Sequence, residues 1–454
     1  MTASAPTNRL SYDDDLFLRI HRALGTPLVN QLAWRFDAPL DPAEVQRLHD
    51  GLSRGPLARR VVPGAVPGAR DRWVRSSHTV PVRFDDDAIE PGAVVDWLAA
   101  RAAVDLDPYD GPAWALAAAP TTDGGAVLSF AASHVVADGG AIIAALIAAI
   151  DGTPIGRLPV DDLSAVQVTI ADEWRDAWHE VRRAARGLRA ARRQPKPAEP
   201  AVAAQRSVDK PTAAARPDDA LPAEGATVFV DCPAAQWHAA ARAADGTANS
   251  LMLAIVAEIL LACGGAESGR PIEVGVSVSA RTGTGDLRAN ATTGTAIVVD
   301  TELRDGVGVV TDLAHIRQRS RAEFAAMAAG TRPDALEPLK PLLQLVPDGL
   351  AKLAAANAAA PLAFASNLGR CDERLAAPFG VPARSIAMRA VTRNATRGML
   401  RRMRGGVSAW WNESGERCTL AVLGLDQDAF PDRATLLAAV ARVYERWGLT
   451  PEPW

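Results

Sequence analysis

The sequence has few cysteines and none in a metal-binding pattern. Its four cysteines are spread over 454 residues, with no C-x-x-C pair and no histidine at metal-ligand spacing from any of them. This usage argues against a disulfide framework and against a zinc site, so no bound metal is expected. A reducing, cytoplasmic setting is the default expectation.

Long hydrophobic runs and an excess of basic charge are also missing. The longest apolar run, 141–150, is shorter than the roughly 20 residues of a membrane-spanning helix. Residues 1–15 are polar and then acidic, so they contain no signal-peptide core. A net charge of -4 argues against a general nucleic-acid partner, which would attract a basic surface.

The length indicates more than one packed unit, because domains usually hold about 100–200 residues. The segment after Gln194 is rich in proline and alanine and has no lasting apolar period as far as Pro222. We interpret 195–222 as an exposed linker between an N-terminal lobe, 1–194, and a C-terminal lobe, 223–454.

In the first lobe, a hairpin followed by a helix is predicted. The apolar runs 113–120 and 126–132 flank an Asp-Gly turn, which is typical of a β-hairpin. The second run leads to His134, and the apolar segment 141–150 predicts a buried helix. His134 is therefore expected on a tight connection between a strand and a helix.

The second lobe also mixes strands and helices. Helices are predicted at 249–263 and 436–447, and strands at 272–279, 295–301, 362–366, 407–411 and 418–423. The strand at 362–366 is expected to end in a turn at 367–370, and the last two strands are expected to form a hairpin. The fold class is therefore α/β (α+β), with a mixed sheet and helices in each lobe.

The position of His134 suits a general base. An imidazole accepts and returns a proton near neutral pH, which typically accelerates a reaction by about 10²–10⁴-fold. The free N–H groups at the start of the following helix can stabilise an oxyanion. Asp138 can cap that helix or pair with a distant cation. From spacing alone, a packed histidine with a purely structural role is the competing interpretation.

The segment from Ser133 to Gly140, SHVVADGG, resembles the H-x-x-x-D-G motif of condensation-domain-like acyltransferases. This superfamily includes peptide-synthetase condensation domains, wax ester synthase/diacylglycerol acyltransferases, polyketide-associated acyltransferases and chloramphenicol acetyltransferase. Four further segments resemble its motifs in the same order, namely 109–114, 247–262, 276–281 and 366–370. The resemblance extends from about Leu10 to Leu436.

The resemblance implies two chloramphenicol-acetyltransferase-like lobes with an active-site channel between them. His134 would be the general base, with the N–H of Gly139 near the oxyanion. Asp138 and Arg281 would form a structural ion pair. The residues implied in substrate binding are Ser133, Gly140, Ser366 and Asn367.

The resemblance also implies an activity. The protein would transfer an acyl group from acyl-CoA or a carrier-protein thioester to a lipid-like or secondary-metabolite hydroxyl, with no permanently bound cofactor and no covalent acyl-enzyme. The alternatives are an amide-forming condensation enzyme with an amine acceptor and a non-catalytic binding protein. Two departures from the family pattern are Ser133, where many relatives have histidine, and the turn after Asn367. No carrier-protein serine motif is visible, so a free-standing enzyme is expected.

Two arginine-rich segments have competing interpretations. In 173–193, Trp174, Trp178, Val181, Ala185 and Leu188 form one helical stripe. Peripheral contact of this helix with an anionic membrane is one interpretation, and the favoured one packs the stripe on the first lobe with the basic face in solvent. Arg397 and Arg401 are candidates for binding the phosphates of CoA, with an ordinary surface role as the equal alternative.

Overall fold

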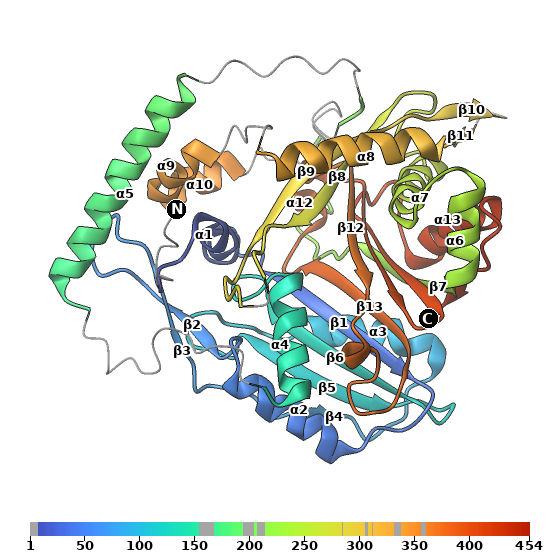
Figure 1. The fold of residues 1–454 in the computed structure, drawn as a ribbon, viewed down its shortest axis with the longest axis horizontal. Coiled ribbons are helices and arrows are strands. Elements are labelled where there is room, and N and C mark those ends of the chain that lie inside the picture. Colours follow the sequence, from blue (N-terminus) through green and yellow to red (C-terminus); the bar gives the residue numbers. More distant parts are fainter. Residues whose placement is uncertain are drawn as a thin grey trace.

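The computed structural model describes residues 8–153, 168–193, 204–206, 214–283, 285–304, 307–310, 312–330, 337–355 and 360–454. The described chain forms two main β-sheets, of five and seven strands, with helices packed on them (Figure 1). This arrangement confirms the mixed α/β class expected from the sequence.

The first sheet has the strand order β13-β1-β6-β5-β4. Its strands are β1 (Leu28–Phe36), β4 (Arg83–Phe84), β5 (Trp114–Pro120), β6 (Ala126–Ser133) and β13 (Ala383–Thr392). β5 and β6 pair antiparallel, which confirms the predicted hairpin. Every residue of β6 is buried because this strand lies between β1 and β5. His134 thus follows the most enclosed strand of the sheet.

β13 belongs by sequence to the C-terminal half, yet it completes the first sheet. It pairs antiparallel with β1, from Leu28 opposite Thr392 to Arg35 opposite Ser385. The boundary between the lobes in sequence is therefore not the boundary between the sheets. Apolar periodicity does not predict this pairing, because it reports how a strand buries its faces and not which strand it joins.

The second sheet has the order β16-β7-β15-β14-β12-β8-β9. Its strands are β7 (Ala226–Pro233), β8 (Ile272–Ser279), β9 (Thr292–Val299), β12 (Ala363–Arg370), β14 (Val407–Ser414), β15 (Arg417–Gly424) and β16 (Glu452–Pro453). The predicted hairpin of β14 and β15 is confirmed. β9 begins three residues before the predicted strand.

The turn predicted after β12 is wrong. The strand continues through Asn367 to Arg370, and an irregularity in its pairing with β14 lies between Asn367 and Gly369. Gly369 has a φ of +73°, a conformation that glycine adopts without steric cost. The turn-like residues therefore form a bulge that lets pairing with β14 resume at Asn412 and Glu413.

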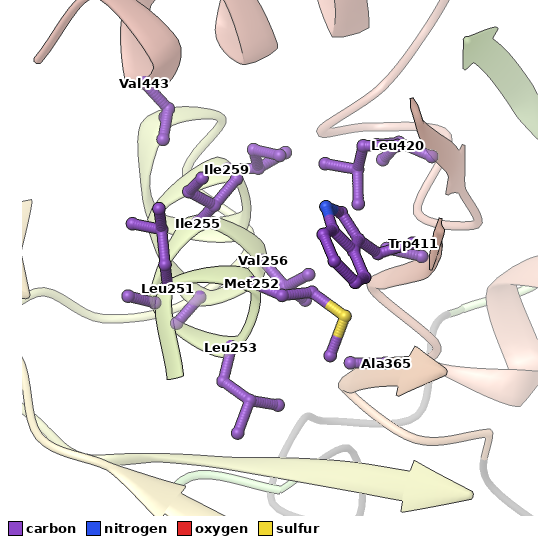
Figure 2. Packing of buried hydrophobic residues seen from close by; sticks show 14 of the residues in the cluster. Leu251, Met252, Leu253, Ile255, Val256, Ile259, Ala365, Trp411, Leu420 and Val443 are labelled. Carbon is purple, nitrogen blue, oxygen red and sulfur yellow. The ribbon is translucent and has the colours of Figure 1, made fainter. Parts of the chain in front are cut away.

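The core of the second sheet is organised around helix α7 (Ala248–Ala262), in which every residue from Ser250 to Leu261 is buried. Figure 2 shows α7 side chains between Trp411 and Leu420 of the sheet and Val443 of α13 (Arg433–Arg446). Within the described ranges no single helix is long and apolar enough to cross a membrane, and only the bent pair of α6 (Ala234–Ala243) and α7 passes such a test together.

The remaining elements surround the two sheets. They are α1 (Tyr12–Arg19), η1 (Ile20–Leu24), α2 (Pro42–Arg54), β2 (Arg59–Val62), β3 (Arg72–Arg75), η2 (Pro91–Ala93), α3 (Val94–Ala102), α4 (Gly139–Asp151), α5 (Ile170–Ala191), β10 (Glu302–Arg304), β11 (Val307–Val309), α8 (Leu313–Ala328), η4 (Glu337–Leu339), α9 (Lys340–Leu345), α10 (Asp348–Ala355), α11 (Glu373–Ala376) and α12 (Arg397–Met403). α4, α7 and α13 confirm the three helices predicted from apolar runs.

The predicted linker is not exposed throughout. Ala204 and Gln205 are buried. The side-chain amide of Gln205 donates to the carbonyl oxygens of Glu267 and Arg270, at 2.7 and 3.1 Å. These bonds satisfy the buried amide and attach this part of the segment to the second lobe. Residues 194–203 and 207–213 lie outside the described residues.

Helix α5 is formed as predicted, but the favoured orientation is wrong. Its buried face carries Glu173 and Glu180 and the small residues Ala177 and Ala184, whereas the tryptophan stripe faces solvent. The glutamates are buried because arginines of the first lobe and of α5 itself neutralise them. These ion pairs join Glu173 to Arg9 and Arg72, and Glu180 to Arg70 and Arg183.

Candidate active site

His134 is the first residue after β6, in the five-residue connection to α4. Its backbone N–H donates to the carbonyl of Leu28 at 2.9 Å, which continues the pairing with the β1 side of the sheet. The amide of Asn30 donates to the carbonyl of Ala137 at 2.9 Å and holds the far end of the connection. The ring is therefore presented by backbone fixed at both ends.

Asn290 determines which nitrogen of His134 carries the proton. Its Nδ2 donates to Asp14 Oδ1 at 3.1 Å and to the carbonyl of Val135 at 3.2 Å, so its Oδ1 must face the ring. That Oδ1 lies 3.1 Å from Nδ1 of His134. An amide oxygen only accepts, so Nδ1 carries the hydrogen and Nε2 of the neutral ring is left with a lone pair.

Helix α1 supplies the other two contacts around the ring. Phe17 stacks on His134, with ring centroids 3.7 Å apart and planes 20° from parallel. Asp14 is buried and also accepts from the backbone N–H of Asn290 at 3.0 Å. Ser11 caps the helix with Asp14 in a reciprocal capping box, so one carboxylate serves both the helix start and Asn290.

The surroundings of His134 favour its neutral form. Burial lowers the pKa of His134, and the charge of Asp138 and the hydrogen bond to Asn290 oppose this shift without reversing it. The side chain is half-buried rather than sealed. At neutral pH the imidazole is therefore available as a base, with Nδ1 occupied. Among the described residues, no hydrogen bond reaches Nε2.

Asp138 both caps α4 and pairs with a cation. Its Oδ1 accepts from the N–H of Ala141 at 2.8 Å and from Arg281 Nη2 at 2.5 Å. Its Oδ2 accepts from the N–H of Ala291 at 2.7 Å and from the hydroxyl of Thr292 at 2.9 Å. Burial alone would raise the pKa of Asp138, but these bonds hold the pKa below its ordinary value. The structure thus brings Asp138 and Arg281 together as an ion pair.

Arg281 shapes the loop that carries Asn290. Its Nη1 donates to the carbonyl oxygens of Asp286 and Arg288, at 3.0 and 2.9 Å. A side chain on Gly140 would place its Cβ 2.8 Å from Arg281 Nε, so glycine permits this close approach. The ion pair therefore positions the loop of Asn290, the partner of His134, although no described hydrogen bond joins Asp138 or Arg281 to the ring.

Gly139 begins α4 close to β13 of the first sheet and β12 of the second. A Cβ at this position would lie 2.9 Å from Cε of Met388 and 4.0 Å from Cδ2 of Leu368. The first N–H groups of a helix have no partners within the helix. In the described part of the chain, no hydrogen bond uses the N–H of Gly139 or Gly140. These two donors therefore lack a protein acceptor among the described residues.

The residues expected to bind substrate lie at the end of β6, at the start of α4 and in β12. Ser133 is buried at the end of β6. Ser366 accepts from the hydroxyl of Ser277 at 2.8 Å, and Asn367 donates to Asn249 Oδ1 at 3.1 Å. These bonds fix the middle of β12 to β8 and α7. No described hydrogen bond joins Ser366 or Asn367 to His134.

The arginines expected to bind CoA already have carboxylate partners. Arg397 pairs with Asp218 at 2.9 Å, and Arg401 pairs with Asp218 at 2.8 Å and with Asp219. The Arg401 side chain is also nearly buried. These aspartates already neutralise both arginines, and a CoA phosphate site here stays a prediction. Across the described residues, no group of three or more His, Cys, Asp or Glu is placed to hold a metal.

The sequence did not indicate Asp14, Phe17 or Asn290. Asp14 and Phe17 belong to an acidic N-terminal segment, and Asn290 follows β8 without any motif of its own. The Ser11-x-x-Asp14 capping box was visible, but it signals only a helix start.

No protein-family model matches the chain, and no curated protein sequence is similar to it. Solved structures are similar in fold. The first condensation domain of the calcium-dependent antibiotic synthetase, in complex with a substrate analogue, is 16% identical with a TM-score of 0.57, and the match covers 98% of this chain and 97% of that chain. Another structure of that domain gives a TM-score of 0.59 at 15% identity, over 98% and 97%.

The starter condensation domain of rhizomide synthetase, in complex with C8-CoA, matches with a TM-score of 0.52 and 13% identity, over 98% of this chain and 94% of that chain. The similarity spans nearly the full length of each protein. The chain therefore has the two-lobed fold of condensation domains, which confirms the condensation-domain-like architecture expected from its motifs.

Proposed function

We propose that this protein is an acyltransferase that moves an acyl group from a thioester to a hydroxyl acceptor, with His134 as the general base. The observation that carries the proposal is the bond from His134 Nδ1 to Asn290, which leaves Nε2 as the basic nitrogen. A half-buried neutral imidazole beside free helix N–H groups suits attack on an acyl carbon.

In the proposed reaction the acyl group passes directly from the thioester to the acceptor, with no covalent intermediate on the protein. Nε2 of His134 accepts the proton of the acceptor hydroxyl while its oxygen attacks the thioester carbonyl. The N–H groups of Gly139 and Gly140 donate to the resulting oxyanion. The carbon–sulfur bond then breaks, and the departing thiolate takes the proton from His134. The products are an ester and a free thiol, and Asp138 and Arg281 keep the loop of Asn290 in place throughout.

The solved structures of similar fold suggest the class of donor. One was solved with C8-CoA, and another, a condensation domain of an antibiotic synthetase, with a substrate analogue. We therefore infer that the donor is an acyl-CoA or a carrier-bound thioester that acts as a co-substrate. The acceptor is proposed to be lipid-like or a secondary metabolite. Amide formation is the second candidate, because the similar structures are condensation domains and the same base serves an amine.

A substrate panel tests this proposal. The purified chain is incubated with acyl-CoA donors of several lengths and with alcohols or amines, and the products are identified by mass spectrometry. Ester products with free CoA support the hydroxyl acceptor, and amide products alone favour the second candidate. If neither product forms with CoA donors or with acyl carrier protein thioesters, the acyltransferase proposal is contradicted.

The pH dependence of kcat/KM is expected to follow His134. The base works only when neutral, so activity falls as the pH drops through its pKa. Because burial lowers the pKa of His134, this loss should occur at a lower pH than for a free histidine. Asn290→Ala removes an interaction that favours the charged ring, so the acid limb should shift further down while kcat falls by up to roughly 10²-fold. An unchanged acid limb in this variant would contradict the assigned contact.

A further inference from the structure

Helix α5 presents an unusually apolar surface to solvent. Ile170, Trp174, Trp178 and Val181 are 59%, 50%, 62% and 45% exposed, and Leu188 is 37% exposed. Their spacing of three, four and seven residues places them in one stripe along the helix. Two large aromatic side chains so exposed in one stripe are typical of a docking surface rather than of ordinary surface variation.

The arginines of α5 lie beside this stripe. Arg175, Arg182, Arg186 and Arg189 follow one another at intervals of three, four or seven residues and are exposed, and the exposed Arg193 lies just after the helix. The buried face instead holds Glu173, Asp176 and Glu180, which pair with arginines of the first lobe. Since most carboxylates of the helix face inward, the outward face combines apolar side chains with positive charge.

The body of the protein holds α5 rigidly from the other side. α5 packs on α9 and η4, and a Cβ on Gly187 would overlap the carbonyl oxygen of Pro338. In Figure 1, α5 lies at the outer rim of the molecule, with α9, α10 and α1 on its inner side. The apolar stripe is thus solvent-exposed on a helix that the rest of the protein holds in place.

We propose that α5 is a docking surface for anionic lipid bilayers. A helix with tryptophans and aliphatic residues on one face and arginines beside them lies in the interface of a bilayer, where the apolar side chains enter and the arginines meet lipid phosphates. Glu173, Asp176 and Glu180 face inward and are paired with arginines, so their negative charges do not repel the anionic lipid. This inference does not depend on the proposed acyl transfer.

Vesicle co-sedimentation of the full chain tests the inference. We expect binding to vesicles of phosphatidylcholine mixed with phosphatidylglycerol and much weaker binding to phosphatidylcholine alone. The double variants Trp174→Gln/Trp178→Gln and Arg186→Gln/Arg189→Gln should each weaken binding by roughly tenfold or more. Added salt should weaken binding of the wild-type chain, because it screens the attraction between the arginines and the lipid.

Two matched variants control for general loss of apolar surface and charge. Phe84→Gln/Leu221→Gln removes two exposed apolar side chains elsewhere, and Arg47→Gln/Arg54→Gln removes two exposed charges from α2. Both should bind like the wild type. Failure of the wild type to bind anionic vesicles, or undiminished binding by both α5 variants, would overturn the inference. Self-association that the tryptophan variant abolishes, without vesicle binding, would assign the stripe to a second copy instead and also overturn it.

Discussion

Replacing His134 with alanine is expected to lower kcat for acyl transfer by about 10²–10⁴-fold. The variant lacks the ring that stacks on Phe17 and contacts Asn290, so the proposed acceptor of the hydroxyl proton is lost. His134→Gln is a stricter test, because glutamine fills similar space and forms hydrogen bonds but is not a base. The rate is measured as release of free thiol from the thioester donor.

The matched control for this prediction is His78→Ala. His78 is exposed, and its Nδ1 contacts the carbonyl of Asp110. This variant should keep wild-type turnover. Circular dichroism of each purified variant separates loss of the base from loss of the fold. Wild-type turnover by folded His134→Gln would show that His134 is not the base.

Removing Asp138 is expected to reduce the free energy of unfolding by about 3–5 kcal/mol. Asp138→Ala leaves Arg281, whose side chain is only 12% exposed, without its carboxylate, and it removes the N-cap of α4. The Ala291 N–H and the Thr292 hydroxyl also lose an acceptor. Denaturant unfolding of the full chain measures the change.

An exposed ion pair provides the comparison. Asp96→Ala breaks contacts with Arg433 that lie largely in solvent and should cost about 0–1 kcal/mol. In the double variant Asp138→Ala/Arg281→Ala, part of the stability should return, since no buried charge is then left unpaired. Equal stability of wild type and Asp138→Ala would mean that the pair does not support the lobe junction.

The local parts of this structure follow from local sequence. The hairpin before His134 is predictable because an Asp-Gly turn separates two apolar runs, and α7 is predictable because its apolar residues form a run of helical length. Each of these signals lies within about 20 residues. The same is true of Asp138 as a helix cap, which depends on its position just before α4.

The parts that depend on tertiary contact could not be predicted from residue patterns. Asn290 and Asp14 are 276 positions apart in sequence, yet they meet beside His134. The predicted orientation of α5 is wrong for a related reason. Apolar periodicity assigns the tryptophans to the interior, but Arg9 and Arg70, far away in the sequence, make burial of the acidic face the stable choice.

The crossing of β13 into the first sheet has a consequence for folding. A fragment that ends before Ala383 would leave β1 as a bare edge, with its backbone groups open to pairing with other chains. A fragment that holds only the residues from Ala383 onward would leave β13 without its partner strand β1. Neither half is therefore a self-sufficient folding unit, and the two pieces produced separately should yield native protein only when they are refolded together.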